Sequence, residues 1–117
     1  MNIVAQILTV LVALEFFYIF YRQTIQTTSK QTAELFSFSN DDVANPKVQL
    51  LLKNQGIYNA LIGVGLFVAL FIEQSWVLPI LIYIVLVALY GGYSAGKVSL
   101  FFKQAGLSLL TLIALLF

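Results

Sequence analysis

Glu15 is the residue of this sequence most able to do chemistry, because it is a carboxylic acid inside an apolar run from Ile3 to Tyr21. A carboxylate among apolar groups either pairs with a cation or takes up a proton, since desolvation disfavours its charged form. Lys103 and Arg22 are the nearest candidate cations. Either state suits a site that binds a cation or responds to protons. The structural alternative, in which Glu15 only joins helices by hydrogen bonds, is less favoured.

Several amide and tyrosine side chains lie, like Glu15, six or seven residues along the sequence from a basic residue. Glu15 precedes Arg22 by seven residues, and Asn59 follows Lys53 by six. In a helix both separations correspond to about 10 Å. Polar side chains at one depth in hydrocarbon must find partners, so we expect them to face one another in a polar chamber. The candidate ligand- or proton-binding residues are Glu15, Tyr18, Asn54, Gln55, Tyr58, Asn59, Tyr90 and Gln104.

Composition narrows the chemistry further. The 117 residues include neither histidine nor cysteine, which excludes Cys/His metal sites, disulfides and Ser-His-Asp triads, and we expect no metal and no cofactor. A net charge of +1 with scattered basic residues offers no surface for nucleic acid. Only 9% of the residues are charged, against about 25% in soluble domains. Membrane lipid must therefore cover much of the surface.

Four apolar segments are long enough to position these residues across a membrane, which takes about 20 helical residues. They predict a single domain over residues 1–117, an all-α four-helix transmembrane bundle. An Asn45-Pro46 pair is typical of a helix start, so the second helix is expected to begin there and to project beyond the bilayer. The expected helices cover about 3–21, 46–72, 76–96 and 98–117.

The six basic residues predict the orientation. They lie in or near the first and third connections, and the second connection, around Glu73, contains none. Because basic residues stay on the cytoplasmic side, we expect a multi-pass cell-membrane protein with both termini outside. The long connection over residues 22–45 is then cytoplasmic, and its segment 33–38 is expected to form a short interfacial helix or lip.

Small residues predict where helices approach closely. Ala88, Gly92 and Gly96 recur at every fourth position, which is typical of a helix-packing stripe. The other residues assigned to helix packing are Gly56, Gly63 and Gly91.

The polar residues also carry a resemblance. Leu14-Glu15 with Tyr18, the block Asn54-Gln55-Gly56-Ile57-Tyr58-Asn59, Tyr90-Gly91 and Gln104 resemble the small membrane proteins called domain of unknown function 1304. The family pattern has histidine where this chain has Phe16, and often an acidic residue where it has Gln23. A proton-relay or metal-binding role of that histidine therefore does not carry over. The family name implies no function.

Three hypotheses for the function stay open. The favoured one is small-molecule or ion binding or transport, in which protons and ligand compete for Glu15 and a homo-oligomer completes the pathway. The second is a membrane enzyme acting on a lipid or isoprenoid, although one carboxylate and several amides are not a specific catalytic pattern. The third is an accessory subunit that binds a larger membrane partner through the small-residue stripe.

Overall fold

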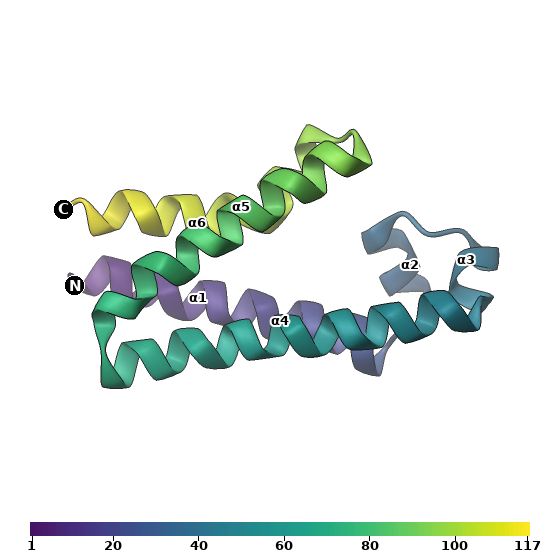
Figure 1. Cartoon of the computed structure of the whole chain (residues 1–117), viewed down its shortest axis with the longest axis horizontal. Coiled ribbons are helices and arrows are strands. Elements are labelled where there is room, and N and C mark those ends of the chain that lie inside the picture. Colours follow the sequence, from purple (N-terminus) through teal and green to yellow (C-terminus); the bar gives the residue numbers. More distant parts are fainter. The chain divides into compact units, whose positions relative to one another are not determined.

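The computed structural model describes residues 1–117, and its regular elements are all helices, without strands (Figure 1). Four helices are long and apolar enough to cross a membrane, as predicted. They are α1 (Ile3–Phe20), α4 (Pro46–Ile72), α5 (Val77–Ala95) and α6 (Val98–Leu115). A π-helical turn, η1 (Tyr21–Ile25), extends α1, so the first candidate span runs from Ile3 to Ile25.

Two compact units make up the chain, and α1 and α4 contribute to both. The first unit contains residues 1–13 and 64–117, and the second contains residues 14–63.

In the first unit, α5 and α6 form a hairpin whose turn depends on glycine. Gly96 ends α5 with a positive φ of 67°, a conformation that glycine adopts without a steric penalty. The backbone N–H of Lys97 then donates to the carbonyl of Gly92 over 3.0 Å. A Cβ atom at Gly92 would lie 3.1 Å from the Cβ of Phe101, so α6 packs directly against the backbone of α5. The chain's own α6 thus covers this part of the small-residue stripe.

The N-terminus belongs to the same unit and is tied to α6. The Asn2 side chain accepts a hydrogen bond from the Ala5 backbone over 2.7 Å and donates to the carbonyl of Ala114 over 2.8 Å. Before α5, the short 3₁₀ helix η2 (Gln74–Trp76) is capped by Glu73, whose carboxylate accepts from the Ser75 hydroxyl over 3.0 Å.

In the second unit, two short helices replace the single short helix predicted between α1 and α4. Helix α2 (Lys30–Phe36) is capped by Ser29, which accepts from the backbone of Thr32 over 3.2 Å, and ends at Ser37 with φ of 60°. Helix α3 (Asn40–Ala44) begins with a capping box between Ser39 and Asp42. The local capping chemistry therefore divides the connection into two short helices.

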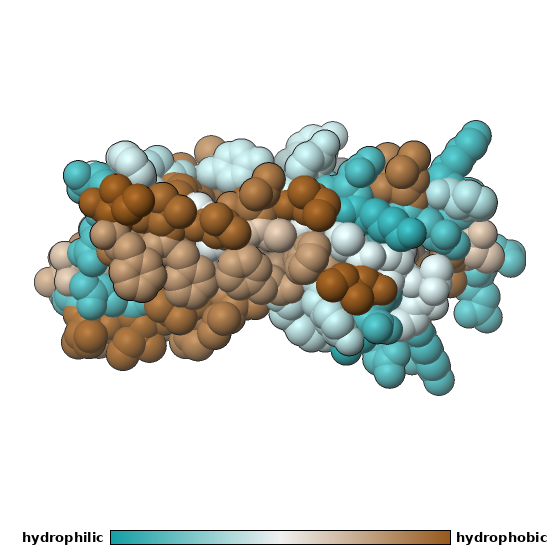
Figure 2. Space-filling view, turned by 90° about the horizontal axis from the view of Figure 1, so that it is seen from below, coloured by the Kyte–Doolittle hydropathy of each residue, from teal (hydrophilic) through white to brown (hydrophobic).

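Helix α4 begins at Pro46, which confirms the start predicted from the Asn45-Pro46 pair. The Asn45 side chain accepts from the backbone N–H of Lys47 over 2.9 Å, satisfying one donor of the first turn. Hydrophilic side chains gather around α2, α3 and the start of α4 in Figure 2. This distribution agrees with the expectation that the first turns of α4 lie outside the hydrocarbon.

Candidate functional site

The end of α1 and the first half of α4 meet in a polar contact within the second unit. The Asn59 side chain donates to Oε1 of Gln23 over 2.7 Å, and both side chains are buried. Six residues earlier along α4, the Thr24 hydroxyl donates to the backbone carbonyl of Lys53 over 2.9 Å. We refer to Gln23, Thr24, Gly56 and Asn59 as the α1–α4 junction.

Gly56 makes this junction possible. A Cβ atom at Gly56 would collide with the Thr24 hydroxyl and would lie 3.1 Å from the Thr24 backbone nitrogen. Only a residue without a side chain lets the two backbones come this close. The packing role predicted for Gly56 thus has a specific partner in Thr24.

Gln23 and Thr24 both lie in the π-helical turn η1. Its wider ring is closed by the backbone N–H of Gln26, which donates to the carbonyl of Tyr21 over 2.8 Å. Isolated π-helical turns inside long helices often occur at functional sites. In this chain the turn carries the two side chains that bind α4.

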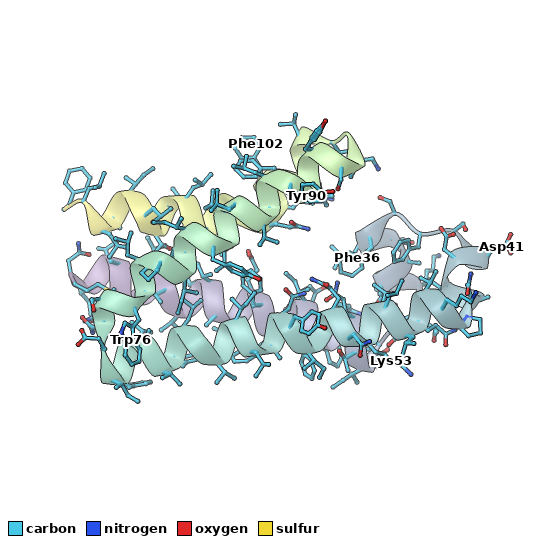
Figure 3. All side chains as sticks on the ribbon, in the orientation of Figure 1. Phe36, Asp41, Lys53, Trp76, Tyr90 and Phe102 are labelled. Atoms are coloured by element: carbon cyan, nitrogen blue, oxygen red, sulfur yellow. The ribbon has the colours of Figure 1, made fainter.

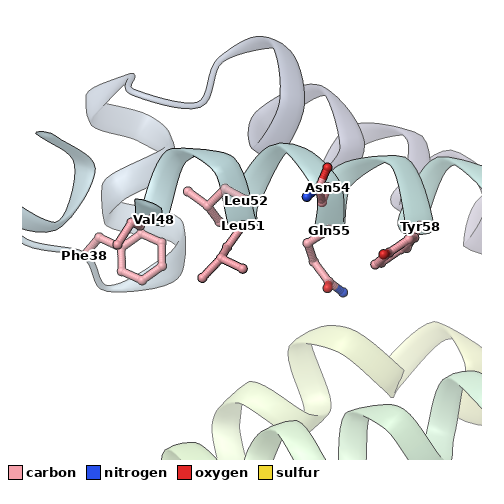
Figure 4. A pocket seen from close by; sticks show the side chains of 7 residues that line it. All are labelled: Phe38, Val48, Leu51, Leu52, Asn54, Gln55 and Tyr58. Atoms are coloured by element: carbon pink, nitrogen blue, oxygen red, sulfur yellow. The ribbon is translucent and has the colours of Figure 1, made fainter. Parts of the chain in front are cut away.

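The polar block on α4 divides between two faces of the helix. Gly56 and Asn59 face the junction, whereas Asn54, Gln55 and Tyr58 contribute to an open pocket of about 480 Å³. Figure 4 shows the side chains of Leu51, Gln55 and Tyr58 projecting to the same side of α4. All lining residues belong to the second unit, and they are Phe38, Val48, Leu51, Leu52, Asn54, Gln55 and Tyr58.

Glu15 lies outside both the junction and the pocket lining. Its Oε1 atom is buried and has no hydrogen-bond partner. The hydrogen bond of Asn59 goes to Gln23, eight residues beyond Glu15, which corresponds to about 12 Å along the helix axis. The Asn59 side chain therefore meets the first span at Gln23 rather than at Glu15.

Arg22 does not serve as the counterion of Glu15. Its Nε donates to the Tyr18 hydroxyl over 3.1 Å, and its guanidinium lies 5.4 Å from the centre of the Tyr18 ring. A second ring, that of Tyr21, lies 5.5 Å away. These cation–π contacts hold Arg22 at the end of α1.

The two remaining candidate residues belong to the first unit. Gln104 on α6 packs against α5, since a Cβ atom at Gly91 would lie 3.3 Å from its Oε1. Tyr90 is exposed on α5, where its ring stacks on that of Tyr93 with centroids 6.5 Å apart (Figure 3). The convergence of Glu15 with Tyr90 and Gln104 stays a prediction.

Sequence reasoning missed Gln23 and Thr24 as partners of α4. The available signal was a glycine within an amide-rich block, which indicates that another backbone approaches there. Two polar residues directly after Arg22 were the natural candidates on the facing helix.

The chain is an all-helical protein with four helices long and apolar enough to cross a membrane, and a buried amide pair joins the first of these spans to the second. The chain belongs to the family described as "Protein of unknown function (DUF1304)", whose model matches residues 10–116. This match confirms the resemblance carried by Glu15 and the polar block on α4. The chain is also similar to the uncharacterized protein YpaA of Lactococcus lactis subsp. lactis (strain IL1403), with 47% identity over 120 residues and 100% of both chains covered. No solved structure matches it.

Proposed function

We propose that this protein binds a small organic cation within the membrane and that Glu15 is the group for which cation and proton compete. The observation that carries the proposal is the buried Oε1 atom of Glu15, which has no hydrogen-bond partner. Buried polar atoms are almost always paired, so an unpaired acidic oxygen in a membrane span favours a missing ligand or proton.

The proposal includes the arrangement of the protein in the cell membrane. The four long helices form a bundle with both termini outside and the 22–45 connection in the cytoplasm. Basic residues in the first and third connections support this orientation. Membrane helices with a buried acid often belong to transport pathways, and transport by a homo-oligomer is the extension of this proposal.

Competition at Glu15 has a defined sign. A cation gains from the ionised carboxylate, whereas protonation removes the negative charge that attracts it. Lowering the pH therefore weakens cation binding, by at most about tenfold for each pH unit when a single proton competes. Raising the pH strengthens binding until Glu15 is fully ionised.

Binding of tetraphenylphosphonium to the full chain in lipid nanodiscs tests the proposal, with affinity measured between about pH 5 and about pH 8. The wild-type affinity should fall with falling pH, and Glu15→Gln should bind weakly and independently of pH. Glu73→Gln is the matched control, since Glu73 lies between the second and third candidate spans, where it caps the short helix η2. The proposal would be overturned if the affinity of Glu15→Gln for tetraphenylphosphonium changed with pH as that of the wild type does, or if the wild-type affinity did not change with pH.

A further inference from the structure

Arg22 is the one basic residue of the chain that is not exposed. All five lysines are exposed, and the only ion pair joins Lys30 to Glu34 over 4.0 Å. Arg22 is half-buried near the end of the first candidate span, and no carboxylate oxygen lies within 4.0 Å of its guanidinium nitrogens. Its positive charge therefore has no counterion within the protein.

Two tyrosine rings and one hydrogen bond hold this guanidinium in place. Its Cζ atom lies 5.4 Å from the centre of the Tyr18 ring and 5.5 Å from that of the Tyr21 ring, and its Nε donates to the Tyr18 hydroxyl over 3.1 Å. Contacts with aromatic faces fix the plane of an arginine that would otherwise move freely in water. Arg22 is thus a positioned cation, in contrast to the exposed lysines.

Most of the hydrogen-bonding capacity of this cluster is unused. A guanidinium has five N–H donors, and the four on the two Nη atoms of Arg22 have no acceptor in the structure. The Tyr18 hydroxyl accepts from Nε and keeps its own proton for a second hydrogen bond. The paired N–H groups of arginine match two oxygens of a carboxylate or a phosphate, but only a phosphate has a further oxygen for the tyrosine hydroxyl. The cluster therefore fits a phosphate group best.

The surface beside the cluster indicates where such a phosphate comes from. Leu14, Tyr18 and Tyr21 follow one another at i, i+4 and i+7, so they share one face of the first span, and all three are exposed. The 23 residues of this span are about 35 Å long, slightly more than a hydrocarbon core of about 30 Å, so Arg22 lies near the headgroups and Leu14 at mid-depth. A phospholipid has its charged and apolar groups in the same order.

We propose that Arg22, Tyr18 and Tyr21 form a binding site for a phosphate group carried by an anionic phospholipid. The Nη groups of Arg22 donate to two phosphate oxygens, the Tyr18 hydroxyl donates to a third, and an acyl chain lies along Leu14. The site goes beyond the cation binding proposed for Glu15, because it takes a ligand of opposite charge on another side chain. Either proposal can fail while the other stands.

Binding of dioctanoyl phosphatidic acid to the full chain in a nonionic detergent, measured by native mass spectrometry, tests this site. The wild type should bind this lipid at least about tenfold more tightly than dioctanoylglycerol, which has the same chains without the phosphate. Equal affinity for the two lipids would overturn the proposal. Inorganic phosphate at the same concentration should not displace the lipid, and displacement would keep the phosphate site but overturn its assignment to a lipid.

Variants separate this site from a general attraction between charges. Arg22→Gln should lower the affinity for phosphatidic acid to that for dioctanoylglycerol. Lys53→Gln is the matched control, because it removes the same charge from an exposed side chain of the same unit, and it should bind as the wild type does. Equal losses in these two variants, or no loss in Arg22→Gln, would contradict the proposal.

Tyr18→Phe tests the same site without changing its charge. This variant keeps the aromatic ring and removes only the hydroxyl, so it should weaken phosphatidic acid binding about threefold to tenfold. Because Tyr18 is exposed, the fold should be retained, which thermal unfolding checks. Wild-type affinity in Tyr18→Phe would exclude the hydroxyl from the site, whatever the behaviour of Arg22→Gln.

Discussion

The Asn59 side chain on α4 donates a 2.7 Å hydrogen bond to the side-chain carbonyl of Gln23 in the π-helical turn that extends α1. Both residues are buried, at 8% and 5% exposure, so neither amide can turn to water instead. The pair fixes the contact between α1 and α4 and determines which face of α4 remains open. The junction is therefore the part of this structure most sensitive to single substitutions.

Asn59→Leu should lower the free energy of unfolding by about 1–3 kcal/mol, because it leaves the Gln23 amide buried without a partner. The double variant Gln23→Leu/Asn59→Leu should be less destabilised than the sum of the single variants, with a coupling energy of about 1 kcal/mol. Reversible unfolding in mixed micelles measures all three. Asn54→Leu removes an exposed amide from the same helix and should change stability by less than about 0.5 kcal/mol. Strict additivity of the two junction substitutions would contradict the pairing.

Gly56→Ala should destabilise the protein by about 2 kcal/mol or more, since the new methyl group collides with the Thr24 side chain. Adding Thr24→Ala should recover only part of the loss, because the Thr24 backbone nitrogen would still lie 3.1 Å from the added Cβ. Gly106→Ala is the control, as nothing lies within 4 Å of its Cβ position, and it should be neutral or slightly stabilising. Reversible unfolding in mixed micelles measures these effects as well. Equal losses of stability in Gly56→Ala and Gly106→Ala would exclude the close approach of Gly56 to Thr24.

Ser108→Ala on α6 should raise the free energy of unfolding by about 1 kcal/mol, because its buried hydroxyl has no hydrogen-bond partner in the structure. Thr111, one turn later on the same helix, donates to the carbonyl of Leu107 over 2.7 Å. Thr111→Val should therefore lower stability slightly, by about 0.5–1 kcal/mol. Thermal unfolding of the two variants side by side checks the difference in sign. A loss of stability in Ser108→Ala as large as that in Thr111→Val would show that the hydroxyl has a partner.

The four long helices could be predicted because hydrophobic length is a property of local composition. Each apolar run is long enough to form a helix of roughly the thickness of the hydrocarbon, and a cap such as Asn45 lies next to the residues it caps, so no tertiary information is needed. The same locality explains why a short helix was expected around Ala33 and why α2 includes that residue.

The junction could not be predicted, because it depends on how two distant segments meet. The rise of a regular α-helix, counted from Arg22 and Lys53, predicts Glu15 at the same level as Asn59. Thr24, two residues past Arg22, instead reaches Lys53, and the amide of Gln23 meets Asn59. Neighbouring residues such as Tyr58 and Asn59 also point in directions about 100° apart on a helix, so they serve the pocket and the junction separately.

Proton release on addition of tetraphenylphosphonium to weakly buffered protein in nanodiscs tests the role of Glu15 most directly. The wild type should release up to about one proton per bound cation over part of the range from about pH 4 to about pH 8, because the cation displaces the proton from the carboxylate. Glu15→Gln should release none. Cation binding without proton release at any pH in that range, or the same release from Glu15→Gln, would contradict the account.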